Sequence, residues 1–357
     1  MQRLAINGYG RIGRTILRAL QESPHRSELE IVAINELADA ATVAHLTRYD
    51  STHGRFPGEV ELHQGRLRVS RDGEIREKTL LREAHIADLD WSRDQVDLVL
   101  ECSGAFSDRQ TAQAHLAAGA RRVLFSQPAE ADVDATIVFG INEGALDAAH
   151  RIVSAASCTT NGIVPVIAVL NEAFGIESGT ITTIHSAMND QPVLDAYHNT
   201  DLRKTRAAGQ SIIPVDTGLA RGIERILPDL AGRFTAQALR VPTLNVSAMD
   251  LTVVVERDVS GGDVNTALAR AAAERFAGVL GYTEEPLASC DFNRDARSSI
   301  VDACQTRVSG RRLVKVLTWF DNEWGYANRM LDVACYWASL ARVGDAAGVV
   351  KPAAIRY

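Results

Sequence analysis

The sequence predicts an α/β protein of two domains, the first with a doubly wound parallel sheet and the second an α+β domain with a mixed sheet. Three observations support this. A glycine-rich turn joins the first apolar strand to a helix, and short apolar runs then alternate with helical stretches as far as residue 155. After residue 158, longer β-rich runs dominate. Alternation of strands and helices is typical of parallel sheets, whereas strands with few helices between them favour a mixed sheet.

The first domain is expected over residues 1–157. Leu4–Ile6 forms an apolar strand, and apolar side chains recur at helical spacing between residues 11 and 21. The charged segment 59–78 alternates apolar with polar residues, which predicts small antiparallel strands. The remaining strand candidates are 29–34, 96–100, 122–125, 136–139 and 152–155, with a helix over 108–118.

The second domain is expected over residues 158–321, with strands at 180–184, 236–241, 251–256 and 313–320. Helical periodicity returns after it, and we expect a helix over 322–342 that completes the first domain. Residues 343–357 form a tail rich in small apolar residues, without recognisable chemistry.

Composition narrows the class of protein. The 357 residues carry a formal net charge of -7, so the chain lacks the basic character of nucleic-acid-binding proteins and no nucleic acid is expected as a partner. Five cysteines at irregular spacings, with no Cys-x-x-Cys pair, indicate a reducing compartment and no metal site. No apolar run approaches the ~20 residues of a membrane span and no leader precedes the first strand. We therefore expect a cytoplasmic protein without a membrane partner.

Cys158 lies in the run Ser157-Cys158-Thr159-Thr160-Asn161, directly before an apolar segment of helical length. A helix that begins at this cysteine would present free N–H groups and the positive end of its dipole to the sulfur, which lowers a thiol pKa. The pattern predicts a nucleophilic thiolate. The other cysteines have no such setting and are expected to be small buried side chains: Cys102, Cys290, Cys304 and Cys335.

The run Gly8-Tyr9-Gly10-Arg11-Ile12-Gly13 matches the dinucleotide-binding pattern of Rossmann domains, and it stands between a strand and a helix. Its glycines permit a tight turn and close approach to a pyrophosphate, which the helix N-terminus attracts. Glu36 ends the second strand, where a carboxylate can accept both ribose hydroxyls and repel a 2′-phosphate. These features favour NAD over NADP. A plain turn and an ordinary surface glutamate are the alternatives.

His185 ends an apolar strand 27 residues after Cys158. An imidazole there can stabilise the thiolate and act as general acid and base on an aldehyde oxygen. A histidine inside a β run is as often a satisfied core residue, and the residues alone leave both readings open.

Binding of an anionic substrate requires local cations in this acidic chain. Arg240 is a strong candidate because it ends a strand shortly before a proline, and because a guanidinium can bind phosphate through a bidentate contact. For the cationic run at 203–206, a solvated loop or a subunit contact is the alternative. The other candidates are Arg203, Lys204 and Arg206.

Five motifs stand along the chain: Asn7-Gly8-Tyr9-Gly10-Arg11-Ile12-Gly13-Arg14, Tyr49-Asp50-Ser51-Thr52-His53-Gly54-Arg55-Phe56, Ser157-Cys158-Thr159-Thr160-Asn161, Arg240-Val241-Pro242-Thr243 and Trp319-Phe320-Asp321-Asn322-Glu323-Trp324-Gly325-Tyr326. Together they resemble the glyceraldehyde-3-phosphate dehydrogenase family nearly from end to end. The resemblance implies an NAD-dependent aldehyde dehydrogenase that works as a homotetramer. In it, Cys158 is the nucleophile, His185 its base and Asn322 the residue that orients the nicotinamide carboxamide.

The resemblance also implies two sets of binding residues. Those for the cofactor are Asn7, Gly8, Gly10, Arg11, Ile12, Gly13, Glu36, Ser126 and Asn322. Those for the phosphorylated substrate are Ser157, Thr159, Lys204, Thr217 and Arg240.

Within the family, Asn35-Glu36-Leu37-Ala38-Asp39 and His185-Ser186-Ala187-Met188-Asn189-Asp190-Gln191 are more similar to members that oxidise erythrose 4-phosphate to 4-phosphoerythronate, a step linked to pyridoxine biosynthesis. Met188 stands where the phosphorylating glycolytic members usually have threonine, and a thioether cannot donate a hydrogen bond. Lys204 likewise replaces a usual arginine. Erythrose 4-phosphate places its phosphate roughly 1.5 Å farther from the thiol, about one C–C bond. The alternatives are the phosphorylating activity and, from another class, a regulator that senses the cofactor.

Overall fold

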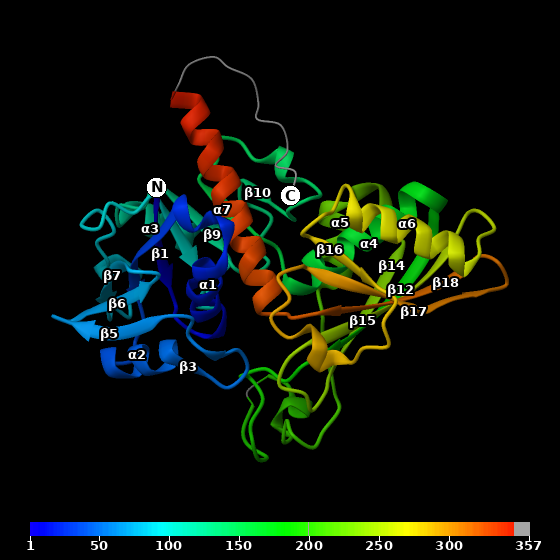
Figure 1. The fold of residues 1–357 in the computed structure, drawn as a ribbon, viewed down its shortest axis with the longest axis horizontal. Coiled ribbons are helices and arrows are strands. Elements are labelled where there is room, and N and C mark those ends of the chain that lie inside the picture. The colour runs from blue at the N-terminus through cyan, green and yellow to red at the C-terminus, as the bar shows by residue number, and fades with distance from the viewer. Residues whose placement is uncertain (199, 346–357) are drawn as a thin grey trace. The chain divides into compact units, whose positions relative to one another are not determined.

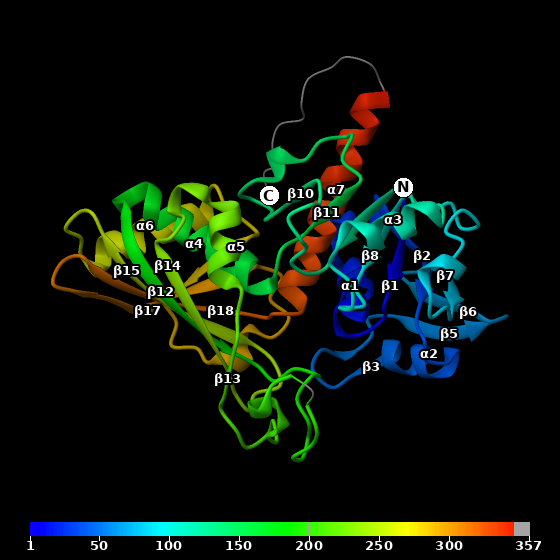
Figure 2. The same cartoon turned by 180° about the vertical axis from the view of Figure 1, so that it is seen from behind.

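The computed structural model describes residues 1–198 and 200–345 and divides into two compact units. Unit 1 comprises Met1–Ser157 together with the described chain from Ala327 onward, and unit 2 comprises Cys158–Tyr326. Figure 1 and Figure 2 show both units from opposite sides. Most of the predicted tail, residues 346–357, lies outside the described residues.

Unit 1 is built on a nine-stranded sheet in the order β10-β11-β9-β8-β1-β2-β7-β6-β5. All neighbours from β10 to β7 are parallel, while β5, β6 and β7 pair antiparallel, so β7 carries the small antiparallel strands into the same sheet. The predicted parallel sheet is therefore confirmed. The strands are β1 (Gln2–Asn7), β2 (Leu29–Asn35), β5 (Glu59–His63), β6 (Arg66–Arg71), β7 (Glu74–Leu81), β8 (Leu98–Glu101), β9 (Arg122–Phe125), β10 (Ala135–Thr136) and β11 (Ile152–Ser154).

The predicted strand over 136–139 is wrong in extent, because β10 ends at Thr136. The Val138 N–H donates to the side chain of Asn142 at 2.8 Å instead of to a neighbouring strand. A local side-chain acceptor of this kind competes with a sheet for the backbone donor.

The helices of unit 1 follow from amphipathic patterns and caps. α1 buries Ile16, Leu17 and Leu20, and the carboxylates of Asp39 and Asp108 cap α2 and α3 by accepting from Thr42 and Thr111 N–H groups. A short hairpin, β3 (Tyr49–Asp50) and β4 (Gly54–Arg55), follows α2. The helices are α1 (Arg11–Glu22), η1 (Pro24–Ser27), α2 (Ala40–Arg48), η2 (Ile86–Asp88), α3 (Arg109–Ala117), η3 (Glu143–Ala145) and α7 (Trp324–Asp345), whose first three residues fall in unit 2.

Unit 2 is built on a seven-stranded sheet in the order β13-β14-β12-β15-β18-β17-β16. The pairs β12–β14 and β16–β17 are parallel and the others antiparallel, which confirms the predicted mixed sheet. The strands are β12 (Ile176–His185), β13 (Ile213–Val215), β14 (Phe234–Arg240), β15 (Ser247–Val255), β16 (Leu280–Thr283), β17 (Ser299–Ser309) and β18 (Leu313–Phe320).

The main helices of unit 2 lie over the sheet (Figure 1 and Figure 2), and α4 contacts both α5 and α6. The sequence analysis does not predict α5, α6 or the long strand β17. For β17 the reason is that its second half carries the exposed polar residues Gln305 and Arg307. The helices are α4 (Cys158–Phe174), η4 (Leu202–Thr205), α5 (Leu219–Ile226), η5 (Pro228–Leu230), α6 (Gly261–Ala273) and η6 (Ser289–Phe292).

All five cysteines are free. Cys102 and Cys335 are buried as predicted, but the prediction is wrong for Cys290 and Cys304, which are exposed. Cys290 lies in the short turn η6, and Cys304 lies where the pairing of β17 is interrupted. Among the helices that the structure describes, none combines the length and the apolar composition needed to cross a bilayer.

Candidate functional site

The glycine-rich turn between β1 and α1 leaves no room for side chains at two positions. Gly8 has a φ of +87°, and a Cβ there would lie 2.4 Å from the Cα of Ser103. A Cβ at Gly13 would lie 2.4 Å from the carbonyl oxygen of Gly8. Beside Gly10, by contrast, the space is open for 4 Å. The turn is therefore tight against the protein at its two ends and open in the middle, where a ligand can approach the backbone.

A pocket of about 390 Å³ opens at the carboxyl ends of β1, β2 and β8 and includes Gly10 and Glu36 in its lining. The carboxylate of Glu36 accepts the Tyr9 N–H at 2.9 Å and the Ala38 N–H at 3.3 Å. Each carboxylate oxygen retains a lone pair for a hydroxyl donor. Glu36 thus holds the glycine turn in place and still offers acceptors to a ligand.

The floor of this pocket is a buried polar network around Glu101. Its carboxylate accepts Asn7 Nδ2 at 2.6 Å, His115 Nε2 at 2.9 Å and the Ser103 N–H at 2.8 Å. Burial acts to raise the pKa of Glu101, but these hydrogen bonds outweigh it and hold the pKa below its usual value. Because Trp91 Nε1 donates to His115 Nδ1 at 3.1 Å, the proton of the neutral ring is on Nε2. The side chain of Asn7 is therefore fixed at the pocket by a buried charge.

The other predicted cofactor residues lie around the same edge of the sheet. The guanidinium of Arg11 pairs with Asp50, so it stabilises the start of α1. Ile12 is half-buried in the first turn of α1. Ser126, also half-buried, directly follows β9, and its N–H donates to the Glu101 carbonyl at 3.0 Å.

Helix α4 begins at Cys158, as the sequence predicts. The approach to it is strained, because Ala156 is buried with a φ of +58°, a region in which a Cβ is unfavourable. The Ala156 N–H donates to Ser154 Oγ at 3.0 Å, which helps to hold this conformation. Strained residues of this kind concentrate at functional sites. Ser157 and Thr159 flank the thiol and are half-buried.

The predicted lowering of the thiol pKa is wrong in its net direction. Burial raises the pKa of Cys158 to about 11, whereas the Thr159 N–H at the helix start and the charge of Arg240 act to lower it. The helix effect that the sequence predicts is present, but desolvation of the anion is larger. The thiol therefore needs a nearby base to become a nucleophile.

His185 ends β12 beside Arg240 of β14, and the Val241 N–H donates to the His185 carbonyl at 2.9 Å. Its Nδ1 lies 2.8 Å from the Ser186 carbonyl oxygen, which only accepts, so Nδ1 carries the proton. Burial lowers the pKa of His185 to about 4, and the charge of Arg240 adds to this effect. The imidazole is therefore neutral at pH 7, with the lone pair of Nε2 available as a base. The charge of Arg240 also acts to lower the pKa of Cys158, so one guanidinium influences both the thiol and the imidazole.

Two of the four candidate anion-binding cations meet at one carboxylate. Asp190 lies 2.9 Å from Lys204 Nζ and 3.3 Å from Arg240 Nη1, and Gln191 Oε1 lies 3.4 Å from the same Arg240 nitrogen. Arg240 is only 12% exposed, so its charge is poorly screened by water. A phosphate that enters here would compete with Asp190 for both cations.

Thr217 lies in a pocket of unit 2, about 620 Å³ in volume, together with Arg203 and Arg221. Its Oγ1 accepts the Leu219 N–H at 3.2 Å. Arg206, the fourth cation, pairs with Asp195 at 3.1 Å and is 64% exposed, as a solvated loop residue would be. The candidate substrate residues therefore fall into two neighbouring groups rather than one.

Asn322 follows β18 and is buried. Its Oδ1 accepts Ser186 Oγ at 2.9 Å and Ser247 Oγ at 3.0 Å, so the amide is oriented and Nδ2 is left as a donor. Ser247 in turn accepts the Ser186 N–H at 3.0 Å. Val246, directly before it, has a φ of +60°, which is costly for a β-branched residue. A strained backbone again places a residue of the site.

Two family models match the chain, one in each unit. Residues 2–109 match the NAD binding domain of glyceraldehyde 3-phosphate dehydrogenase, and residues 157–322 match its C-terminal domain. Together they account for more than half of the chain. The chain belongs to the glyceraldehyde-3-phosphate dehydrogenase family. It is an NAD-dependent oxidoreductase, and the predicted cofactor is confirmed.

NAD fits the pocket of unit 1 for reasons visible in its residues. The open space beside Gly10 admits a pyrophosphate to the helix N-terminus, and Glu36 can accept ribose hydroxyls while repelling a 2′-phosphate. In unit 2, the free amide donor of Asn322 suits a carbonyl oxygen such as that of a carboxamide.

The sequence analysis does not identify the residues that orient or pair with the candidate site residues. Ser186 and Ser247 orient Asn322, Asp190 pairs with two cations, and Glu101 holds Asn7. Only Ser186 and Asp190 have a visible signal, since they lie close after His185. Ser247 and Glu101 are ordinary strand residues until the sheets are assembled.

One group of possible metal ligands exists among the described residues. Ligand atoms of His25, Glu28 and Cys335 lie within 4.8 Å of one another, and His25 Nε2 lies 2.7 Å from Asp332. The sequence expectation of no metal stays a prediction.

Proposed function

We propose that this protein oxidises erythrose 4-phosphate to 4-phosphoerythronate through a thioester on Cys158, with NAD as the electron acceptor. The observation that carries the proposal is the arrangement around Arg240, whose charge acts on the Cys158 thiol and the His185 imidazole and whose side chain lies beside Lys204's partner Asp190. A nucleophile, a base and an anion-binding pair are thereby grouped in one place.

The first step is attack of Cys158 on the aldehyde carbon. As the S–C bond forms, the thiol proton passes to Nε2 of His185 and from there to the former carbonyl oxygen, which gives a hemithioacetal. A neutral thiol beside a neutral imidazole suits this transfer, because neither buried group must carry a charge before the substrate arrives.

In the second step, His185 takes the hemithioacetal hydroxyl proton as the C=O bond re-forms. NAD supplies the acceptor for the hydride that leaves the carbon, and its nicotinamide would be oriented by Asn322. His185 then releases the hydroxyl proton to solvent and is neutral again. Water attacks the thioester carbon, His185 removes a proton from it, and the C–S bond breaks as that proton passes to sulfur. The product is 4-phosphoerythronate and the free thiol.

The choice of substrate depends on the segment that carries Met188. Its N–H donates to Gln191 Oε1 at 3.0 Å, and the turn brings Asp190 and Gln191 to Arg240. Met188 is 44% exposed, and its thioether offers no donor to a phosphate. A site without the threonine hydroxyl of glycolytic members suits a phosphate held farther from the thiol, as in the longer sugar.

The second candidate is the phosphorylating activity on glyceraldehyde 3-phosphate. It is favoured by the half-buried hydroxyls of Ser157 and Thr159, which flank Cys158 and can hold an inorganic phosphate that attacks the thioester.

The test measures NADH formation with each sugar phosphate, with and without inorganic phosphate. We expect the higher kcat/KM with erythrose 4-phosphate and no requirement for phosphate. Strict phosphate dependence with preference for glyceraldehyde 3-phosphate would overturn the proposal in favour of the second candidate. Met188→Thr should raise kcat/KM for the shorter substrate by about tenfold, the value of one hydrogen bond to a charged group. Val193→Thr, on the same loop and 87% exposed, is the matched control.

We also propose that residues 1–157 with the helix over 322–342 act as the NAD-binding domain and residues 158–321 as the catalytic domain of a cytoplasmic homotetramer. Large exposed apolar side chains on the loop after β12 support assembly, because solvent-exposed clusters of this kind mark interfaces. Sedimentation equilibrium of the full chain tests it. The side chains are Val193, Leu194, Tyr197, Leu202 and Ile212, between 66% and 100% exposed.

A further inference from the structure

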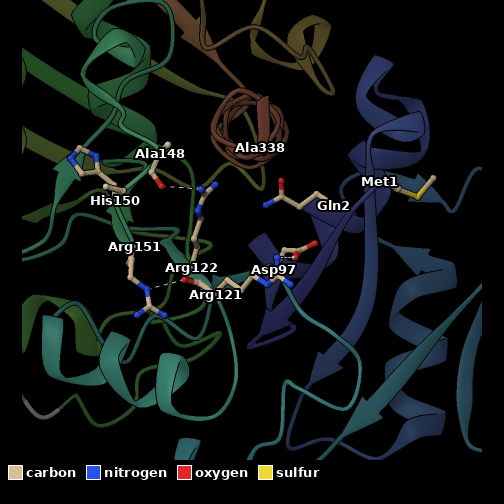
Figure 3. A pocket seen from close by; sticks show the side chains of 10 residues that line it. Met1, Gln2, Asp97, Arg121, Arg122, Ala148, His150, Arg151 and Ala338 are labelled. Carbon is tan, nitrogen blue, oxygen red and sulfur yellow. Dashed lines mark hydrogen bonds and ion pairs between the residues drawn. The ribbon is translucent and has the colours of Figure 1, made fainter. Parts of the chain in front are cut away.

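A second pocket of unit 1, about 420 Å³ in volume, lies among the amino ends of parallel strands and is lined by three arginines (Figure 3). Gln2 comes from β1, Asp97 precedes β8, Arg121 and Arg122 stand at the start of β9, and Arg151 precedes β11. The cofactor pocket is at the carboxyl ends of the same sheet. The two pockets are therefore separate sites at opposite ends of the parallel strands.

Strand pairing fixes the positions of the charged residues. Leu98 pairs with Arg122 between β8 and β9, so Asp97 stands next to Arg121. Val123 pairs with Ile152 between β9 and β11, so Arg122 stands next to Arg151. Neighbouring strands lie about 4.8 Å apart, so the sheet itself holds two guanidinium-bearing backbones side by side.

The three guanidinium groups are held in different ways. Arg122 donates to the carbonyls of Trp337 at 3.0 Å and Ala148 at 3.1 Å, and lies 5.0 Å from the centre of the Trp337 ring, so it is a fixed group. Arg121 is 81% exposed and reaches Asp97 only at 3.6 Å. Arg151 donates through Nε to the Arg121 carbonyl at 3.2 Å, and its terminal nitrogens have no partner within the described residues.

The lining is therefore rich in donors and poor in acceptors. Three guanidinium charges face one carboxylate, that of Asp97, in a chain whose formal net charge is -7. His150 adds a donor, because its Nδ1 accepts the Asp147 N–H at 3.2 Å and its neutral ring therefore carries the proton on Nε2. Like charges repel, and an anion between them reduces the repulsion.

We propose that this pocket binds a small molecule that carries two or more phosphate groups. Guanidinium groups bind phosphate oxygens in pairs, and three of them at separate places exceed what one phosphate needs. A volume of about 420 Å³ lies within the range typical of small-molecule sites, about 300–1,000 Å³, and exceeds that of a single phosphate ion.

Tripolyphosphate is the probe, titrated into the full-length protein by calorimetry at low salt, both without NAD and with saturating NAD, because NAD fills the cofactor pocket but itself carries two phosphate groups. The Arg240→Gln background weakens binding at the catalytic site. In the Arg240→Gln protein, we expect one binding site for tripolyphosphate to remain. The affinity of this site should fall by about tenfold or more when Arg121→Gln and Arg151→Gln are added, because two charge-assisted contacts are lost. Both arginines are exposed, so the exchange leaves the fold intact.

Arg93→Gln is the matched control, since Arg93 is exposed in the same unit and the exchange removes a charge outside the pocket. Its affinity for tripolyphosphate should stay within about twofold, as expected of distant screened charges. Equal affinities in the double variant and in Arg93→Gln would overturn the proposal. So would tighter binding of inorganic phosphate than of tripolyphosphate. In the protein that retains Arg240, Arg121→Gln/Arg151→Gln should leave NADH formation at the parent level, which separates this result from any failure of the proposed function.

Discussion

The proposed cofactor pocket of unit 1 and the proposed catalytic site of unit 2 are built in contrasting ways. In unit 1, a local motif does most of the work: Gly8, Gly10 and Gly13 shape one turn, and Glu36 holds it through a backbone N–H. In unit 2, Cys158 begins a helix, His185 ends one strand and Arg240 ends another, and the charge of Arg240 acts on both the thiol and the imidazole. The site in unit 1 depends on the absence of side chains at Gly8 and Gly13, whereas the site in unit 2 depends on the chemistry of the side chains that form it.

The strain follows the same division. The positive φ values fall on Ala156, two residues before the proposed nucleophile Cys158, and on Val246, directly before Ser247, which orients Asn322. In the cofactor turn, the positive φ falls on Gly8, where it costs little. Unit 2 thus holds non-glycine residues at unfavourable φ values beside the proposed site residues. In unit 1, glycine adopts the positive φ with little conformational strain.

The largest expected effect comes from removing the nucleophile. Cys158→Ser should reduce NADH formation by at least about a thousandfold, because a serine hydroxyl is a far poorer nucleophile at this pH. NAD affinity, measured by calorimetry, should stay within about twofold, since the cofactor pocket is in unit 1. Cys304→Ser, an exposed cysteine of the same unit, is the control and should retain full activity. Comparable activity in both variants would refute the role of Cys158.

The next effect concerns the base. His185→Asn should lower kcat by about a hundredfold or more, the usual share of general-base catalysis. Since burial lowers the pKa of His185 to about 4, the imidazole stays unprotonated as the pH falls from 7 and is lost as a base only near pH 4. The acid limb of kcat/KM should therefore lie near pH 4. His45 is an exposed histidine on α2, and His45→Asn should leave both kcat and the acid limb of the kcat/KM profile unchanged.

A change in unit 1 should instead act on stability. Burial acts to raise the pKa of Asp50, but the hydrogen bonds from Arg11 and from the His53 and Thr52 N–H groups lower it to about 2. The folded pKa is depressed, so the stabilisation is complete above the unfolded pKa of about 4 and is lost as the pH falls through about 2. Asp50→Asn should cost about 2 kcal/mol of unfolding free energy at pH 7.

The measurement for Asp50→Asn is urea unfolding at several pH values. Its deficit should shrink as the pH drops from 4 to 2, because the native carboxylate becomes protonated as well. Asp72→Asn, at a surface pair that is 73% exposed at the aspartate, should cost less than about 0.5 kcal/mol at any pH. A deficit independent of pH would contradict the assigned ion pair.

The smallest effect tests a residue that acts through another. Ser186→Ala removes one of two donors to Asn322 but keeps the Ser186 carbonyl that orients His185. A single hydrogen bond is worth about 1 kcal/mol, so KM for NAD should rise by about fivefold while kcat changes little. Thr182→Ala, which removes a hydroxyl from the strand that precedes Ser186, should leave KM unchanged. A loss confined to kcat would show that Ser186 does not act through Asn322.

Much of the fold could be predicted because its signals are local. Apolar runs, helical spacing and the glycine turn indicated the parallel sheet, the start of α4 at Cys158 and the mixed sheet of unit 2. Strand β17 was not predicted, because its polar second half lacks the alternation that marks a half-buried strand.

The sequence by itself determined the residue types of both sites. A glycine-rich turn, a thiol at the start of a helix and an acidic residue after a strand can each be recognised from neighbouring residues in the chain. Tertiary structure alone decided the charge states. The thiol pKa was expected to fall and instead rises to about 11, because burial around Cys158 outweighs the helix start. Desolvation depends on atoms brought from distant parts of the chain, as do the serines that orient Asn322 and the arginines aligned at the amino ends of β9 and β11. Spacing along the sequence encodes local geometry, whereas the electrostatic environment of a buried group arises only when the sheets are assembled.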